Sequence, residues 1–167
     1  MKNTNENIEK ICNFYVSDTH FAVMILPFVN KEIDYNKKII PIFEGNNVEN
    51  VKQLTKQFDL SNKQEILNIN WKKSDKNSLV KSLEEKLKSD SENIIIVNGT
   101  DSYIKYVNNE INSLINTQQL SDKKLKVIDC YELEKNKNKL GDIVKNYNEI
   151  LDTSGIHELS KNTTSAL

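Results

Sequence analysis

Glycine is scarce in this chain, and the glycine-rich loops of nucleotide-binding proteins are missing. Only four of the 167 residues are glycine. A P-loop and a dinucleotide-binding turn both need glycines so that the backbone can approach phosphates closely. Neither pattern occurs, and no nucleophile elbow of the form G-x-S-x-G occurs. These absences favour a protein that senses or docks over one that catalyses.

Arginine is absent altogether, since all 23 basic residues are lysine. Arginine is the side chain that holds carboxylates and phosphates with a two-pronged fork, so the chain has no arginine finger. Codon bias explains the absence more simply than functional avoidance, because lysine, asparagine and isoleucine are abundant. The 23 basic and 24 acidic residues give a net charge of −1, which predicts no nucleic-acid partner and no membrane partner.

Cysteine and histidine are also rare. Two of each occur, Cys12 and Cys130, and His20 and His157, which predicts neither a zinc site nor a Cys–His dyad. We expect no cofactor and no metal. Both cysteines fall in predicted strands, which indicates buried thiols in a reducing compartment.

The polar start of the chain indicates no signal peptide, and no apolar run approaches the roughly 20 residues of a membrane span. The sequence therefore predicts a cytoplasmic protein.

What the chain does contain is a regular alternation of short β-branched runs and helical patterns. The order predicts a three-layer α/β/α fold with a mainly parallel sheet of about five strands, Rossmann-like or RecA-like. One domain is expected over residues 1–167, with a folded core at about 8–155 and a polar C-terminal tail at 156–167. The predicted strands are residues 10–16, 38–43, 65–71, 92–98 and 124–131.

The helical patterns carry further expectations. The first, at about 20–33, is apolar almost all round, which predicts cover on more than one side and a surface for a homodimer or a regulatory protein partner. Asp75 and Asp101 can cap the helices that follow them. The last helix is expected to carry Ile143, Val144, Tyr147, Ile150 and Leu151.

A ligand site is expected in the crevice beyond the carboxyl ends of the strands. Strand 10–16 is predicted to lie beside strand 92–98, because the first strand neighbours the fourth in both common orders of such sheets. That arrangement would bring their carboxyl ends together. The candidate ligand-binding residues are Ser17, Asp18, His20, Glu44, Trp71, Asn98, Thr100, Asp101 and Tyr131.

These candidates also have purely structural explanations. Asp18 and Asp101 are what helix N-caps require, and Asn98 suits a tight turn. His20 fits plain packing or exposure to solvent, and Trp71 fits a lid over the core as well as a stacking platform. The residues alone leave these alternatives open.

Several short motifs carry a family resemblance. They are Ile11–Asp18, Leu26–Phe28, Lys38–Ile42, Ile96–Gly99, Asn109–Glu110 and Val127–Tyr131. Together they resemble the MEDS domain, the sensory domain of methanogen and methylotroph regulators, over about residues 10–155. The resemblance implies a RecA/KaiC-like fold without a working P-loop, and a cytoplasmic signal-input module in bacteria or archaea. It implies no catalytic residues.

The sequence thus predicts a non-catalytic signal-sensing or regulatory module that binds a small ligand or a partner protein. The alternative is a small α/β nucleotide-binding protein or enzyme that uses the crevice at the strand carboxyl ends. A third interpretation is an interaction domain without a pocket.

Overall fold

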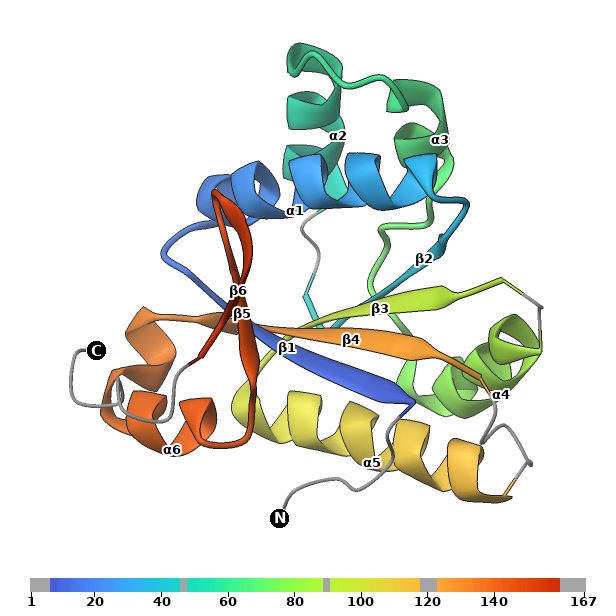
Figure 1. Cartoon of the computed structure of the whole chain (residues 1–167), viewed down its shortest axis with the longest axis vertical. Coiled ribbons are helices and arrows are strands. Elements are labelled where there is room, and N and C mark those ends of the chain that lie inside the picture. The colour runs from blue at the N-terminus through green and yellow to red at the C-terminus, as the bar shows by residue number, and fades with distance from the viewer. Residues whose placement is uncertain (1–6, 46–47, 89–90, 118–122, 160–167) are drawn as a thin grey trace.

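The structure, a computed structural model, describes residues 7–45, 48–88, 91–117 and 123–159. They form the predicted three-layer α/β/α fold, with helices on both faces of one sheet (Figure 1). The elements, in chain order, are β1 (Ile8–Tyr15), α1 (Asp18–Asp34), β2 (Lys38–Phe43), α2 (Val48–Gln57), α3 (Lys63–Asn68), α4 (Lys76–Leu87), β3 (Asn93–Asn98), α5 (Asp101–Thr117), β4 (Leu125–Glu132), the 3₁₀ helix η1 (Glu134–Lys139), α6 (Leu140–Val144), β5 (Glu149–Asp152) and β6 (Gly155–Glu158).

The sheet has six strands in the order β2-β3-β4-β1-β5-β6. Strands β1 to β5 are parallel to one another, and β6 runs antiparallel to β5. The order of the first five strands is the RecA-like one, which agrees with the predicted fold class. The run Asn93–Asn98 is buried along its whole length, as expected for a strand covered on both faces.

The predicted neighbour of the first strand is wrong. β1 pairs with Leu125–Glu132 and not with Asn93–Asn98, because β4 lies between β1 and β3. The error has a simple cause: the sequence pattern counts residues 65–71 as a strand, which raises the number of every later strand by one. The carboxyl ends of β1 and β3 nevertheless approach each other, since the Tyr15 hydroxyl donates to Oδ1 of Asn98 over 2.7 Å.

Residues 65–71 form no strand, which corrects the sequence prediction. Most of the segment belongs to α3, and Ile66 and Trp71 are buried in the core that α1 covers. The helix starts where Asn62 is tied to α1: its backbone N donates to Oδ1 of Asn30 and its Nδ2 donates to the Asn30 carbonyl, each over 2.9 Å. The alternating apolar residues therefore pack against a helix instead of pairing in the sheet.

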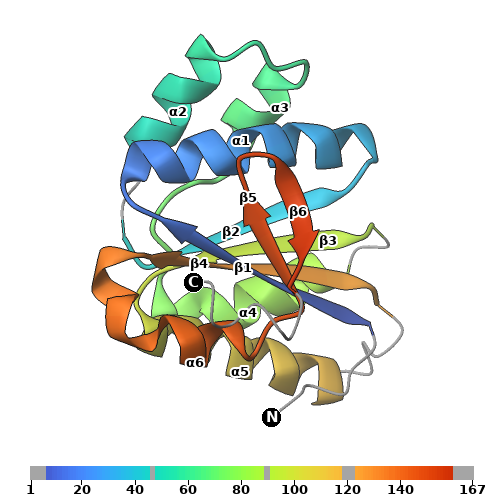
Figure 2. The same cartoon turned by 60° about the vertical axis from the view of Figure 1, so that its left-hand side comes forward.

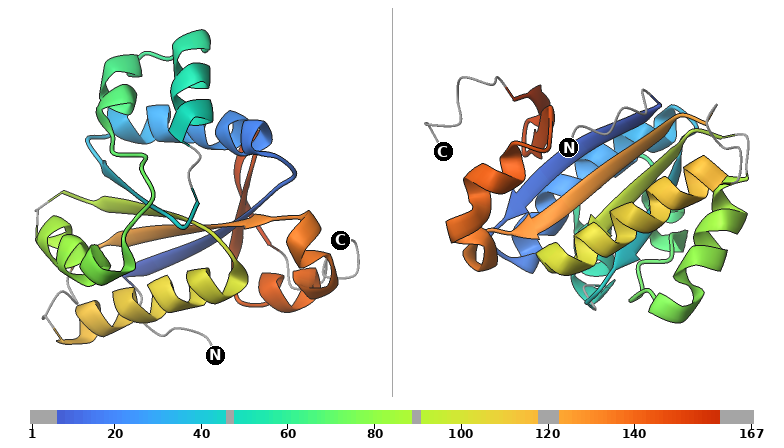
Figure 3. Two further views of the ribbon diagram at one scale, coloured as in Figure 1. Left: turned by 180° about the vertical axis from the view of Figure 1, so that it is seen from behind. Right: turned by 90° about the horizontal axis from the view of Figure 1, so that it is seen from below.

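The two faces of the sheet carry separate hydrophobic cores. α1 covers one face, with α2 and α3 outside it, and α4, α5 and α6 cover the other (Figure 3). The expected cover of the apolar first helix on more than one side is confirmed, because the sheet and the α2–α3 pair both pack on α1. The prediction of a homodimer or a partner protein at this helix stays untested. The reason for it was an exposed apolar face, and the apolar side chains of α1 are instead buried against the sheet and the α2–α3 pair.

The predicted last helix ends early. Ile143 and Val144 lie in α6, but Ile150 and Leu151 lie in β5 of a hairpin that reaches toward α1 (Figure 2). Leu151 packs with the core under α1 and Ile150 with the opposite core, so the two side chains that suit a helical stripe alternate across a strand. The predicted polar tail begins as β6, and its residues 160–167 lie outside the described part.

The hairpin creates a pH-dependent contact. Burial, together with the neighbouring carboxylate of Glu9 on β1, raises the pKa of Glu149 to about 7. Because this pKa exceeds the ordinary value of 4.5, the folded protein binds more protons than the unfolded chain between the two values. The free energy of unfolding should therefore fall as the pH rises through this window.

We expect Glu149→Gln to melt at a higher temperature than the wild type at pH 8, with the gap closing toward pH 4.5. Thermal melts followed by circular dichroism at several pH values measure this gap. Glu85→Gln is the control, since Glu85 is exposed on α4 and should show no pH-dependent gap. An equal gap at both ends of the pH range would contradict the prediction.

Candidate ligand-binding crevice

A cavity of about 690 Å³ opens at the carboxyl edge of the sheet, where β1, β2, β3 and β4 end. Its volume lies in the range of roughly 300–1,000 Å³ that small-molecule sites occupy. Five of the nine candidates from the sequence line this crevice: Asp18, Glu44, Asn98, Thr100 and Asp101. The topology therefore brings these five together, and their role as ligand contacts stays a prediction.

Two candidates next to β1 serve the first helix instead. The Oγ of Ser17 accepts from the backbone N of His20 over 3.1 Å, as an N-cap does. The Nδ1 of His20 in turn accepts from the backbone N of Val16 over 3.0 Å. Neither side chain lines the crevice.

The two aromatic candidates are buried away from the crevice. Trp71 is 1% exposed, and its Nε1 donates to the Ile66 carbonyl over 2.8 Å. The sequence predicts it at the end of a strand, but it follows α3 and is buried in the core that α1 covers. Tyr131 is 3% exposed, and its hydroxyl pairs with that of Tyr147 over 2.7 Å.

The most informative side chain in the crevice is Asn98, at the end of β3. It is 4% exposed, and its Nδ2 has no hydrogen-bond partner among the described residues. Its Oδ1 accepts from the Tyr15 hydroxyl, and burial raises the pKa of Tyr15, so this phenol remains a protonated donor. An unpaired buried donor costs about 1–3 kcal/mol. A ligand that brings an acceptor would remove that cost.

Glu44 accepts a hydrogen bond at the start of α5. Its Oε1 accepts from the backbone N of Thr100 over 2.8 Å, and the Thr100 Oγ1 accepts from the backbone N of Tyr103 over 3.3 Å. Gly99 permits this approach, because a Cβ there would lie 2.9 Å from the Glu44 Cβ and 2.6 Å from the Tyr103 ring. The expected cap at Asp101 is therefore wrong, since Thr100 caps this helix.

The helix starts at the crevice are therefore already occupied by the protein's own oxygens. The N-terminus of a helix attracts anions because its first N–H groups are unpaired and its dipole is positive there. Ser17 accepts from one N–H group of the first turn of α1, and the carboxylate of Glu44 accepts from the N–H group of Thr100 at the start of α5. A phosphate group would have to displace them, so the geometry disfavours nucleotide phosphates in the P-loop manner.

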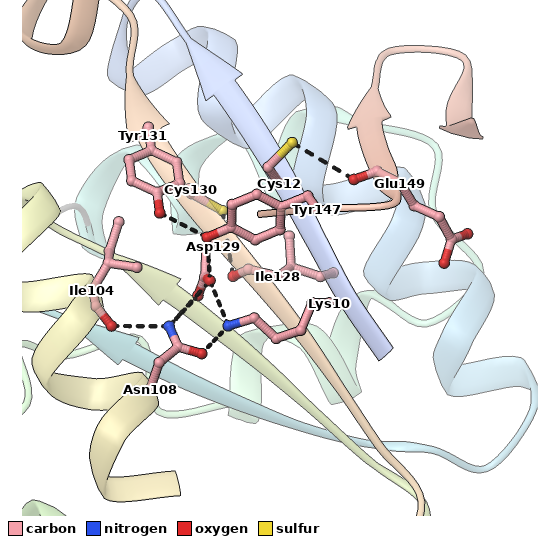
Figure 4. Close-up of polar contacts among 10 residues, drawn as sticks. All are labelled: Lys10, Cys12, Ile104, Asn108, Ile128, Asp129, Cys130, Tyr131, Tyr147 and Glu149. Carbon is pink, nitrogen blue, oxygen red and sulfur yellow. Dashed lines mark hydrogen bonds and ion pairs between the residues drawn. The ribbon is translucent and has the colours of Figure 1, made fainter. Parts of the chain in front are cut away.

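A polar network that the sequence analysis did not single out lies on the α5 side of the sheet (Figure 4). Asp129 of β4 is fully buried, and its carboxylate accepts from Lys10 Nζ at 2.8 Å, Tyr147 hydroxyl at 2.6 Å and Asn108 Nδ2 at 3.1 Å. Lys10 also donates to Oδ1 of Asn108. The signal available in the sequence is a charged residue inside each of two apolar strands.

The two thiols are buried in β1 and β4 and are free, in agreement with the expected buried cysteines. Burial raises the pKa of Cys12 to about 12 and that of Cys130 well above its usual value. Because the thiolate is the reactive form, neither thiol is a nucleophile near neutral pH.

Comparisons with known proteins leave the function open. No protein-family model and no curated protein matches the chain. One similar solved structure is a chain in the structure of Drosophila ORC bound to AT-rich DNA and Cdc6, with a TM-score of 0.36 and 12% identity. The similarity covers 95% of this chain and 53% of that chain, so this chain spans about half of its length. A likeness at this TM-score carries no argument about function.

Within the described residues, no helix is both long enough and apolar enough to span a bilayer.

Proposed function

We propose that this protein is a non-catalytic signal-sensing module that binds a small polar ligand in the crevice at the strand carboxyl ends. The observation that carries the proposal is Asn98, a residue that lines a cavity of ligand size and whose buried Nδ2 has no partner among the described residues. Buried polar groups in folded proteins are almost always hydrogen-bonded, so a buried donor without a partner suggests an acceptor that arrives with a ligand.

The occupied helix starts support sensing over nucleotide binding. The first turn offers Ser17 and Asp18 where a nucleotide-binding turn would offer backbone N–H groups, and the Glu44 carboxylate would repel a phosphate. The high pKa values of the two thiols leave no cysteine nucleophile in the described part of the chain. The resemblance to MEDS sensory domains agrees with this proposal.

The first experiment is a native mass spectrum of the full chain purified from cells. We expect a mass excess that corresponds to one retained small molecule. Asn98→Leu keeps the side-chain volume but removes the donor, so this variant should lose the excess. Asn93→Leu is the matched control, because Asn93 is equally buried at the other end of the same strand and should leave the excess intact.

Two results would contradict the proposal. The first is a mass excess that survives in Asn98→Leu, which would place the ligand elsewhere. The second is a retained nucleotide, which would favour a nucleotide-binding protein or enzyme.

A further inference from the structure

The charges around the crevice are unevenly paired. Four carboxylates and three lysines line it. Two of the lysines share one carboxylate: Lys105 and Lys139 lie 3.1 and 3.9 Å from Asp101 Oδ2. Asp101 therefore pairs with two of the three lysines. One lysine remains for the other three carboxylates, which are Asp18, Glu44 and Glu132.

That lysine is Lys135 of η1, at the mouth of the crevice. Its Nζ lies 2.9 Å from Glu132, and its side chain is 69% exposed. The hydrogen bond and charge of Glu132 raise the pKa of Lys135, with further contributions from the charges of Asp18 and Glu44. Lys135 therefore pairs with Glu132, and the charges of Asp18 and Glu44 act on it only from beyond contact distance.

Asp18 and Glu44 consequently lack a cation of their own. Among the described residues, neither carboxylate has a lysine or histidine within 4.0 Å. Glu44 is held in place, because it accepts from the backbone N of Thr100 with one oxygen and from the Thr100 hydroxyl, at 3.4 Å, with the other. Glu44 is thus a fixed carboxylate that is held by the start of α5 and not by a lysine, which leaves its charge available to a cationic ligand.

A bare metal ion does not fit this arrangement. In the ranges that the structure describes, no three His, Cys, Asp or Glu side chains are placed to hold one ion. Ca²⁺ takes about six to eight oxygen ligands at roughly 2.3–2.6 Å, and Zn²⁺ takes about four ligands that include His or Cys. The positive charge therefore has to sit on a larger molecule, and the same molecule has to satisfy the Nδ2 of Asn98.

We infer that the crevice selects a small organic cation that also carries a hydrogen-bond acceptor, such as an amino alcohol. Its ammonium group binds between Asp18 and Glu44, and its oxygen accepts from Nδ2 of Asn98. Lys135, which pairs with Glu132 at 2.9 Å, is the internal cation whose charge opposes that of the ligand. This inference rests on the proposed function, because it concerns the same crevice.

The test is a titration of the ¹⁵N-labelled full chain with three related probes, followed at the Asn98 side-chain amide by NMR. The probes are 4-amino-1-butanol, 1,4-butanediol and 4-hydroxybutanoate, which share a hydroxyl and differ in the charge of the other end. We expect the amino alcohol to shift the Asn98 signals with at least about ten-fold higher affinity than the other two, because only it adds an ion pair to the buried hydrogen bond.

Charge variants give effects of opposite sign. Lys135→Gln removes the internal competitor and should strengthen binding of 4-amino-1-butanol by about three-fold, the scale of an exposed ion pair. Glu44→Gln keeps an acceptor for Thr100 but removes the charge, and should weaken binding by a similar factor. Lys137→Gln is the control, because Lys137 pairs with Glu134 on the same 3₁₀ helix and does not line the crevice.

Equal or tighter binding of butanediol or hydroxybutanoate at Asn98 would overturn the inference while leaving the proposed function intact. No response of Asn98 to the amino alcohol would overturn it as well. An unchanged affinity in both Lys135→Gln and Glu44→Gln would have the same consequence. The native mass spectrum with its Asn98→Leu variant decides the proposed function separately, so the two failures are distinguishable.

Discussion

Lys10→Met should lower the melting temperature by about 6–12 °C. Lys10 is the cation that faces the buried carboxylate of Asp129, 2.8 Å away, from a strand 119 residues distant in sequence. Methionine keeps most of the packing of the lysine stem, so the change removes mainly the charge and its hydrogen bonds. Breaking one partner out of a buried ion pair costs about 3–5 kcal/mol.

We use the lower end of that range, because the Lys10 side chain retains 22% of its exposure. For a domain of this size, each kcal/mol shifts the melting temperature by about 2–4 °C. The remaining donors to Asp129, which are the hydroxyl of Tyr147 and the Nδ2 of Asn108, cannot replace a full positive charge. Differential scanning calorimetry measures the shift.

Two further variants identify the cause. Lys145→Met removes an exposed partner of Asp142 and should change stability by less than about 0.5 kcal/mol. Adding Asp129→Asn to Lys10→Met removes the uncompensated charge and should recover part of the loss. If the double variant is less stable than Lys10→Met by the full cost of Asp129→Asn alone, the two residues are not coupled, and the ion-pair explanation fails.

Trp71→Ala should cost about 3–5 kcal/mol of stability, because it leaves a cavity the size of an indole ring in the core under α1. The Trp71 ring lies 5.9 Å from that of Phe43, and its Nε1 satisfies the carbonyl of Ile66 near the end of α3. Denaturant unfolding followed by circular dichroism measures the loss. The same variant should still retain any ligand in the crevice, since Trp71 does not line it.

Trp71→Phe separates packing from hydrogen bonding. Phenylalanine refills most of the space but has no donor for the Ile66 carbonyl, so we expect a smaller loss of about 1–2 kcal/mol. A Trp71→Ala protein of near wild-type stability that no longer retains its ligand would contradict the structural role. It would instead support the stacking platform that the sequence left open.

The site was only partly predictable from sequence. Asp18, Glu44, Asn98, Thr100 and Asp101 each end a strand, follow one or open a helix, and in a parallel α/β sheet such positions meet at one edge. Tyr131 also lies at the carboxyl end of its strand. Its side chain, however, packs in the core on the α5 face of the sheet, where its hydroxyl pairs with that of Tyr147. The pattern of strands predicts which residues lie at the carboxyl edge of the sheet. It does not predict in which direction each side chain points, because that depends on the residues packed around it.

The sequence by itself determined the fold class, the strands Lys38–Phe43 and Asn93–Asn98, and the Asp75 cap of α4, because local periodicity and local hydrogen bonding specify them. Only the tertiary structure decided the strand order, the helix α3 and the β5–β6 hairpin. It also decided the partnership of Lys10 with Asp129. The physical reason is that periodicity reports which side of a segment is buried, whereas the element that buries it comes from a distant part of the chain.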